Sequence, residues 1–216
     1  MKILVIGATG GSGRAAVAEL LERGHDVTVF VRDAEAVRDI ADRVTVRRGD
    51  ATRPEDVDAA VQGHDAVVVT LGISENPLRV RARGPARTPL DVRSRGTRNV
   101  IDAMRRHGVP RLVVQTSYGV GETQGRLPLR YSLMFKLLLG PQIADTEVQD
   151  GLVRGSGLDW TVVQPVNLTD EPADGTATAT VDGEISRWHV SRREVGKVLA
   201  DAAGNGTYRR TTVAVS

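Results

Sequence analysis

The sequence Met1-Lys-Ile-Leu-Val-Ile-Gly7-Ala-Thr-Gly10-Gly-Ser-Gly13 joins a run of four aliphatic residues to three glycines spaced three apart. The aliphatic run is typical of a strand that is covered on both faces in a parallel sheet. Glycines in a tight turn let bare backbone approach a ligand, because no Cβ stands in the way. The stretch therefore predicts a strand, a ligand-binding turn and the start of a helix.

After Gly13 the apolar residues change to a helical period, with Ala16, Val17, Leu20 and Leu21 on one face. The N–H groups in the first turn of a helix have no partners within the helix, and they lie at the positive end of its dipole. Such a turn is a ready site for a pyrophosphate. We therefore expect the glycine turn to bind the phosphates of a dinucleotide; a glycine-rich turn without a ligand is the alternative.

The composition argues against several classes of function. The 216 residues include no cysteine, which rules out disulfides, catalytic thiols and thiolate metal sites. The net charge of +2 and the aromatic content of 3% do not favour binding of nucleic acid. The four histidines lack the spacing of a metal site, and no apolar run approaches the roughly 20 residues of a membrane span. We expect a soluble, cytoplasmic protein with one domain over residues 1–216 and with no signal peptide, metal or membrane partner.

Strand and helix patterns alternate along the chain. Strands are expected at residues 3–6, 25–31, 44–47, 65–69, 111–116, 160–164 and 208–215, with a short extra strand at 176–181. Helices are expected between the first two strands and at residues 34–41, 52–62, 90–107, 127–139, 145–155 and 191–203. Thr52 with Glu55, and Ser191 with Glu194, match the capping-box pattern. The alternation predicts an α/β fold: a doubly wound parallel sheet with helices on both faces and a small C-terminal extension on the substrate side.

Residues 73–89 interrupt this alternation. The stretch contains Arg79, Arg81, Arg83 and Arg87 among several prolines, and it follows neither the strand nor the helix period. It leaves the carboxyl edge of the sheet, where ligands bind in such folds. It is either a lid over an anionic substrate or a mobile surface loop.

The chain resembles the atypical members of the short-chain dehydrogenase/reductase superfamily, of the NmrA-like and biliverdin reductase B (flavin reductase) type. The segments that carry the resemblance are Gly7–Gly13, Val31-Arg32-Asp33, Gly49-Asp50, Gly96-Thr-Arg-Asn-Val100, Thr116-Ser117 and Ser156-Gly-Leu-Asp-Trp-Thr-Val-Val-Gln-Pro165. The resemblance implies a Rossmann-like fold and binding of NAD(P), often with hydride transfer. Some members of the family are sensors that bind the cofactor without turnover.

We expect NADP(H) to bind across the carboxyl ends of the first and fourth strands. The expected cofactor-binding residues are Gly7, Thr9, Gly10, Gly11, Ser12, Gly13, Arg14, Arg32, Asp50, Ala51, Thr70, Leu71, Gly72, Ser117, Pro165, Val166 and Asn167. Arg32 stands where an acidic residue would select NADH, and a guanidinium binds a 2′-phosphate well. Arg14 would supply a second cation, whereas Asp33 is a competing signal for NADH.

The catalytic candidates are Ser117 and Tyr131. In typical members of the superfamily a tyrosine is followed four residues later by a lysine, which lowers the pKa of the phenol. Here Lys136 lies five residues after Tyr131, and Phe135 takes the position of the lysine. An offset of five turns the lysine about 100° away along a helix. Ser117, at the end of a strand, matches the active-site serine of the relatives.

Three functions are compatible with these features. The first is an NADPH-dependent reductase that transfers hydride to a small conjugated acceptor, such as a flavin, quinone or tetrapyrrole. The second is a dinucleotide-binding regulator that senses redox state without turnover. The third, a sugar-nucleotide epimerase or dehydratase, is weakened by the missing Tyr-x-x-x-Lys spacing. Trp188 is either a wall of the substrate pocket or an ordinary packing residue, and both a monomer and a dimer remain open.

Overall fold

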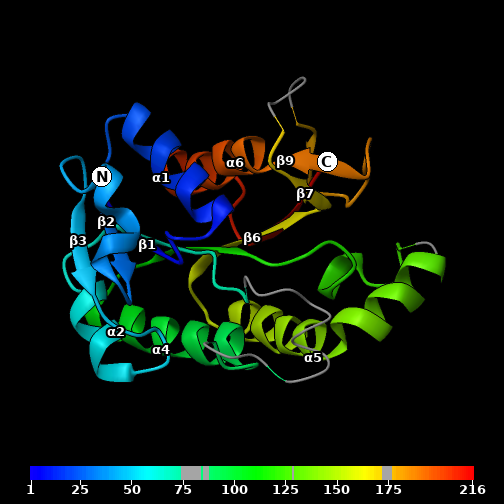
Figure 1. Ribbon diagram of the computed structural model, residues 1–216, viewed down its shortest axis with the longest axis horizontal. Helices are drawn as coiled ribbons and strands as arrows, with labels where there is room; N and C mark the ends of the chain where they lie inside the picture. Colours follow the sequence, from blue (N-terminus) through cyan, green and yellow to red (C-terminus); the bar gives the residue numbers. More distant parts are fainter. Residues whose placement is uncertain (74–83, 85–87, 128, 172–176) are drawn as a thin grey trace.

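The computed structural model describes residues 1–73, 84, 88–127, 129–171 and 177–216, and of residues 129–138 it describes the backbone only. Eight strands form one sheet in the order β3-β2-β1-β4-β5-β6-β10-β8 (Figure 1). Their bounds are β1 Lys2–Ile6, β2 Asp26–Val31, β3 Thr45–Arg48, β4 Ala66–Val69, β5 Arg111–Gln115, β6 Asp159–Pro165, β8 Ala179–Thr180 and β10 Thr211–Val215. All neighbouring strands are parallel except β8, which runs antiparallel to β10.

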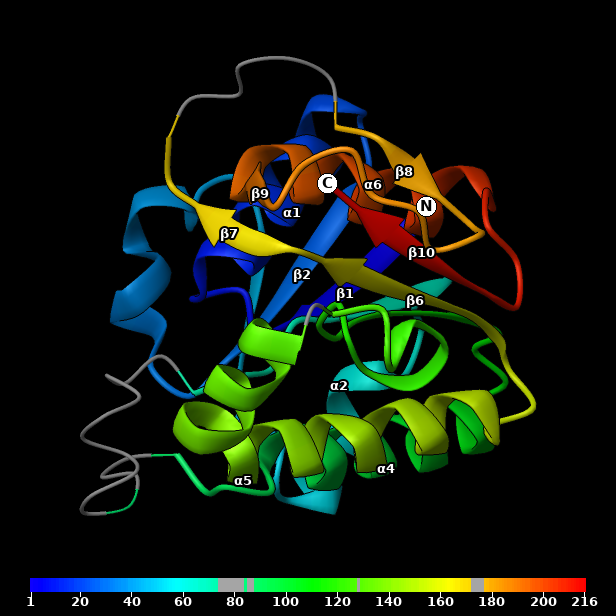
Figure 2. The same ribbon diagram turned by 90° about the vertical axis from the view of Figure 1, so that its right-hand side faces the viewer.

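Helices cover both faces of this sheet. The helices are α1 Gly11–Glu22, α2 Pro54–Val61, α4 Val92–His107, α5 Leu129–Arg154 and α6 Arg192–Asn205, with short 3-10 helices η1 Ala34–Ile40 and η2 Gly121–Thr123. Helices α1 and α6 lie on one face, and α2, α4 and α5 lie on the other (Figures 1 and 2). The strands β7 Asn167–Thr169 and β9 His189–Ser191 form a separate two-stranded sheet. This arrangement confirms the predicted doubly wound, Rossmann-like α/β fold.

Two hydrophobic cores explain why the strands are continuously apolar. Alternate residues of a strand point to opposite faces. Ile3 and Val5 belong to the core beneath α1 and α6, whereas Leu4 and Ile6 belong to the core beneath the other helices. None of these four side chains is more than 1% exposed. A strand that feeds two cores has no room for polar residues, as the run in β1 predicts.

One of the two predicted capping boxes is confirmed. Ser191 Oγ accepts the N–H of Glu194 at 3.2 Å, and Glu194 Oε2 accepts the N–H of Ser191 at 3.2 Å. The box predicted at Thr52 is wrong, because both the N–H and the hydroxyl of Thr52 donate to Asp50 Oδ1 at 2.9 Å. Helix α2 begins at Pro54, two residues after the predicted start at residue 52.

The sequence predicts two helices, 127–139 and 145–155, separated at Gly140-Pro141, and this separation is also wrong. A single helix, α5, runs through both residues, with Pro141 inside it. Figure 2 shows the helix changing direction along its length, as a proline inside a helix is expected to cause. Contacts with α4 hold the second half in place: Gln149 Nε2 donates to Thr97 Oγ1 at 2.9 Å, and both side chains are fully buried.

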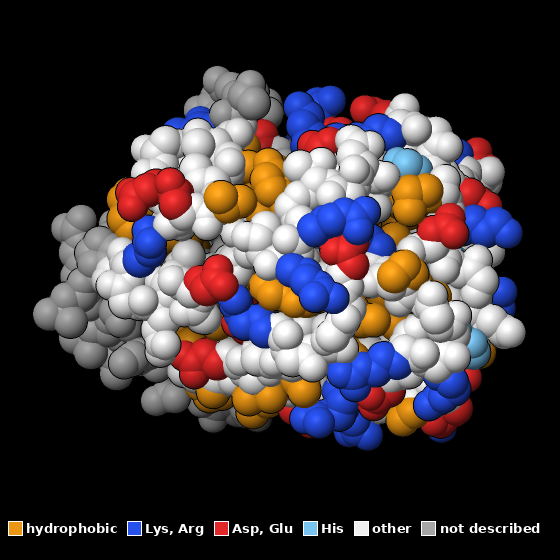
Figure 3. Space-filling view, turned by 180° about the vertical axis from the view of Figure 1, so that it is seen from behind, with side chains coloured by type: hydrophobic (Ala, Val, Ile, Leu, Met, Phe, Trp, Pro, Cys, Tyr) orange, Lys and Arg blue, Asp and Glu red, His pale blue; other side chains and the backbone are white. Residues whose placement is uncertain are grey.

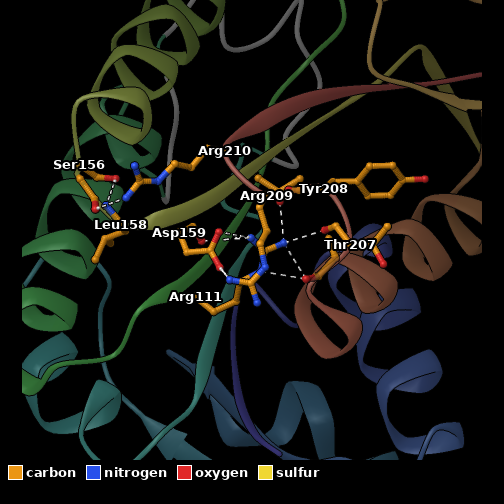
Figure 4. A network of polar contacts seen from close by, with 11 residues as sticks. Arg111, Ser156, Leu158, Asp159, Thr207, Tyr208, Arg209 and Arg210 are labelled. Atoms are coloured by element: carbon orange, nitrogen blue, oxygen red, sulfur yellow. Dashed lines mark hydrogen bonds and ion pairs between the residues drawn. The ribbon is translucent and has the colours of Figure 1, made fainter.

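At the amino end of the sheet, the side chain of Arg111 connects β5 to β6 and to the end of α6 (Figure 4). Its guanidinium donates to the carbonyl of Ala202 at 2.7 and 2.9 Å, to Thr161 Oγ1 at 2.6 Å and to Asp159 Oδ1 at 3.3 Å. A cation at the carboxyl end of a helix also interacts favourably with its dipole. Arg111 is 4% exposed and lies at the edge opposite the glycine turn. Its contacts therefore assign it a structural role.

The surface carries charges of both signs. On the face in Figure 3, basic and acidic side chains are interspersed, so no single-sign field dominates this face. No helix in the described part of the chain is long and apolar enough to span a membrane. A cytoplasmic location stays a prediction.

Candidate functional site

A cavity of about 290 Å³ opens beside the carboxyl ends of β1, β2 and β4. Twelve of the predicted cofactor-binding residues line it: Gly7, Thr9, Gly10, Gly11, Ser12, Gly13, Arg32, Asp50, Ala51, Thr70, Leu71 and Gly72. The parallel register explains the grouping, since β1, β2 and β4 all end at the same edge of the sheet. We call this space the first cavity.

The three spaced glycines serve different purposes. Gly7 has φ of +92°, and a Cβ there would lie 2.6 Å from the carbonyl oxygen of Thr70. A Cβ on Gly13 would lie 2.2 Å from the carbonyl oxygen of Gly7. On Gly10, by contrast, the nearest atom would be 3.5 Å away, and φ and ψ are −77° and 158°. The protein's own packing thus requires Gly7 and Gly13, while the backbone of Gly10 is left uncovered beside the cavity.

The start of α1 is suited to an anion. No side chain caps it, and no acidic residue lies in its first turn. The N–H groups of an uncapped first turn need acceptors, and a negative charge is favourable there. The observed turn therefore fits a dinucleotide's pyrophosphate.

Arg32 lines the first cavity at the end of β2, and its Nη2 donates to Thr88 Oγ1 at 3.3 Å. Asp33, the competing signal for NADH, caps η1 instead, because its carboxylate accepts the N–H of Glu35 at 3.1 Å. Arg14 pairs with Asp39 at 2.7 Å, and it is not among the described residues that line the cavity. Its role as a second cation stays a prediction.

Asp50, one of the predicted cofactor-binding residues, lines the cavity after β3. Burial opposes ionisation, but the hydrogen bonds from the N–H and hydroxyl of Thr52 and the charges of Arg32 and Arg53 lower the pKa of Asp50. The carboxylate is therefore ionised near neutrality, with Oδ1 occupied by Thr52.

A second cavity, of about 250 Å³, lies beyond the ends of β5 and β6. Its walls include the predicted residues Ser117, Pro165, Val166 and Asn167. Arg93, Gln115 and Leu168 line both cavities, so the two spaces meet along the sheet edge. The remaining wall is formed by Thr116, Tyr118, Gly119, Val120, Leu127, Leu139, Ile143 and Trp188.

A family model described as NAD(P)H-binding matches residues 7–205. The chain belongs to this NAD(P)H-binding family. The uncharacterized chloroplastic protein At2g34460 of Arabidopsis thaliana is 30% identical over 205 residues, which cover 93% of this chain and 71% of that protein. The uncharacterized sugar epimerase YhfK of Bacillus subtilis is 26% identical over 202 residues, covering 92% and 86%. The structure of ChuY, an anaerobillin reductase from Escherichia coli O157:H7, matches with a TM-score of 0.79 and 22% identity, covering 100% of this chain and 96% of that one.

Membership of the NAD(P)H-binding family agrees with the sequence-based expectation that the chain binds NAD(P), and the residues of the site stay a prediction. The likeness to ChuY shows a shared fold only, because the identity is low. In this family member the uncovered backbone of Gly10 and the uncapped start of α1 are the features that fit the nucleotide's phosphates.

The second cavity has an aromatic wall. Tyr118 and Trp188 meet edge to face, with ring centroids 6.3 Å apart. The Tyr118 hydroxyl donates to the carbonyl of Gly183 at 3.0 Å, and burial raises the pKa of this phenol. Tyr118 is thus a neutral donor already in use. Trp188 forms part of the wall of the second cavity. This position agrees with the prediction of a pocket wall, which was one of the two alternatives for Trp188.

Of the two catalytic candidates, Ser117 lies half-buried in the second cavity, after the end of β5. Tyr131 belongs to α5, but its side chain and that of Lys136 lie outside the described residues, so their geometry stays a prediction. Next to Ser117, the buried Thr116 Oγ1 and Gln115 Oε1 have no hydrogen-bond partner among the described residues.

Two arginines that line the cavities are not predicted from the sequence. Arg192 starts α6 and lines the first cavity; a Cβ on Gly11 would lie 2.3 Å from its Cδ, and its Nη1 pairs with Asp170 at 2.6 Å. Arg93, near the start of α4, lines both cavities. The capping box before Arg192 was a signal for a helix start, but nothing in the sequence places that start beside the glycine turn. Of the arginine-rich stretch 73–89, Ile73, Thr88 and Pro89 line the first cavity, and the four arginines lie outside the described residues.

Proposed function

We propose that the protein is an NADPH-dependent reductase that transfers hydride to a small conjugated acceptor in the second cavity. The observation that carries this proposal is the junction of the two cavities at Arg93, Gln115 and Leu168. A dinucleotide with its phosphates at the glycine turn would extend along the sheet edge toward this junction. Bound NADPH would supply the hydride, and the second cavity would hold the acceptor against it.

The chain's own residues would bind and orient. Arg32 is suited to the 2′-phosphate, because guanidinium and phosphate form charge-assisted hydrogen bonds and Asp33 is engaged in capping. Pro165, Val166 and Asn167 would hold the nicotinamide carboxamide, since they line the second cavity after β6. Ser117 would donate one hydrogen bond to the acceptor.

The acceptor is conjugated on this proposal because the site offers little acid–base chemistry. A saturated alcohol needs a positioned base to remove its proton as hydride leaves. The Tyr131 and Lys136 spacing does not match that requirement. A conjugated ring system delocalises the charge that arrives with hydride, so water can protonate the product. An apolar wall with Tyr118 and Trp188 suits such a ring.

A cofactor-binding sensor without turnover is the second candidate, and the same unmatched Tyr131–Lys136 spacing favours it. The deciding experiment follows NADPH oxidation at its absorbance band with flavins, quinones and tetrapyrroles as acceptors. Turnover supports the reductase. Tight NADPH binding with no turnover of any acceptor supports the sensor and contradicts the proposed reaction.

A further inference from the structure

Arg93 occupies the place where the two cavities meet. It is the second residue of α4, and its half-buried side chain lines both spaces. Its Nη1 donates to the carbonyl of Leu71 at 2.6 Å, which fixes the guanidinium against the chain after β4. A Cβ on Gly72 would lie 2.9 Å from Nη2, so glycine at this position leaves room for the guanidinium.

The positive charge of Arg93 lacks a carboxylate partner among the described residues. None of the ion pairs within 4.0 Å in the described chain includes it. Asp145, the acidic residue that acts on it electrostatically, uses its two oxygens to accept the N–H groups of Arg93 and Ser94 at 3.0 and 3.2 Å. Burial lowers the pKa of Arg93, and the charge of Asp145 opposes this only in part.

A desolvated charge without a partner is costly, so such groups are usually paired in the working state of a protein. Arg192 in the same region shows the ordinary solution, because Asp170 lies 2.6 Å from it. For Arg93 the carbonyl of Leu71 satisfies one N–H group and supplies no negative charge. Asp145 supplies negative charge nearby, but its oxygens accept backbone N–H groups, so no carboxylate oxygen of the described residues lies within 4.0 Å of the guanidinium.

The surroundings define the partner. The second cavity is lined by apolar side chains, including Leu127, Leu139, Ile143 and Trp188, so the body of its ligand is apolar. Among the described residues of this cavity wall, Arg93 is the one cation. One cation balances a monoanion such as a carboxylate, and a phosphate dianion would keep an unmatched charge. A volume of about 250 Å³ suits a ligand of one or two fused rings.

We propose that Arg93 binds the carboxylate of the acceptor, and that the second cavity selects a planar, apolar monocarboxylic acid. This inference rests on the proposed function and narrows its substrate class. The guanidinium would hold the carboxylate at the junction while the conjugated body lies against the aromatic wall. Arg93 is then a specificity-determining residue, since it recognises a group of the acceptor that does not react.

The test uses a matched pair of acceptors, a quinone carboxylic acid and the methyl ester of the same compound. With the parent protein we expect a lower KM for the acid. Arg93→Met keeps the length of the side chain and removes the charge, so the KM for the acid should rise about tenfold or more, as the loss of one charge-assisted interaction predicts. The KM for the ester should change much less than the KM for the acid, because the ester carries no negative charge. Arg93→Lys should recover part of the preference for the acid.

Arg95→Met is the control, because Arg95 is an exposed arginine on the same helix. It should change none of these values. The proposal is overturned if Arg93→Met weakens the acid and the ester equally, or if the parent protein does not prefer the acid.

A binding measurement distinguishes failure of the proposed reaction from failure of the carboxylate site. Quenching of tryptophan fluorescence by the acid and the ester, with NADP⁺ present, reports binding in the second cavity through Trp188 without turnover. Tight, Arg93-dependent binding of the acid without NADPH oxidation keeps the carboxylate site and rejects the reductase. Turnover with equal binding of both compounds keeps the reductase and rejects the carboxylate site.

Discussion

Gly13 lies so close to Gly7 that a Cβ on Gly13 would be 2.2 Å from the carbonyl oxygen of Gly7. This contact ties the start of α1 to the end of β1, and it separates two reasons for glycine in the same turn. Gly13 is required by the protein's own packing. A Cβ on Gly10 would meet nothing closer than 3.5 Å, so the absence of its side chain matters for a ligand.

The first prediction uses this difference. Gly10→Val should fold, because its φ of −77° and ψ of 158° suit a β-branched residue. Its side chain would occupy the space of the pyrophosphate, so the Kd for NADPH should rise by at least tenfold. Thermal unfolding and fluorescence titration measure the two properties. A Gly10→Val protein that folds and binds NADPH like the parent would show that the phosphates do not lie at this turn.

Gly13→Ala should lose stability, whereas Gly10→Val should lose affinity for the nucleotide. Its Cβ meets backbone that cannot move freely, so we expect a loss of about 2 kcal/mol or more in the free energy of unfolding. Urea denaturation measures this loss. A stability equal to that of the parent would show that the turn relaxes around the added methyl group.

The elements at this edge follow from local sequence, whereas several contacts do not. The four aliphatic residues of β1 predict a strand covered on both faces, because each side chain must enter one of two cores. Pro141 gave the wrong boundary, since the helix continues through it and contacts with α4 hold the part of α5 that follows. Thr52 gave the wrong cap, because Asp50 competes for its donors.

Two arginines of the site could not be predicted from the sequence for a related reason. Arg93 and Arg192 start helices that are distant in sequence, and both reach the same sheet edge only through the packing of whole elements. Arg32 was found because it directly follows a strand whose end is a known ligand position in this fold. Sequence patterns thus located residues at strand ends better than residues on helices that approach from outside.

The second prediction concerns the choice of nucleotide. Arg32→Ala should raise the Kd for NADPH tenfold or more, since a charge-assisted hydrogen bond contributes about 1.5–3 kcal/mol. The Kd for NADH should hardly change, because NADH lacks the 2′-phosphate. Arg38→Ala, which removes an exposed arginine paired with Glu35, is the control and should affect neither. Equal losses for both nucleotides in Arg32→Ala would assign this arginine a structural role.

Arg14 can be tested in the same titration. Its guanidinium pairs with Asp39, so Arg14→Ala should weaken NADPH binding less than Arg32→Ala does. A larger effect on NADPH than that of Arg32→Ala would show that Arg14 leaves Asp39 and supplies the main cation.

The third prediction separates stability from binding. Arg111→Met removes the donors that hold the carbonyl of Ala202 and Thr161 Oγ1. We expect a loss of about 3 kcal/mol in the free energy of unfolding, because buried acceptors are left unsatisfied. The Kd for NADPH should stay unchanged, since Arg111 lies at the other end of the sheet. Arg209→Met is the matched control: Arg209 also pairs with Asp159 but is 67% exposed, so its loss should cost less than about 1 kcal/mol. Equal losses for the two variants would contradict the assignment of Arg111.

The fourth prediction tests how little acid–base chemistry the protein supplies. Ser117→Ala should lower kcat toward a flavin or quinone by about tenfold, as the loss of one hydrogen bond in the transition state predicts. Tyr131→Phe should keep most of the activity, because Lys136 lies one position beyond the place where it could lower the pKa of the phenol. Steady-state kinetics with saturating NADPH measures both effects. A drop of several thousandfold in Tyr131→Phe, at unchanged Kd for NADPH, would show that the tyrosine is the acid and that α5 is distorted to bring Lys136 to it.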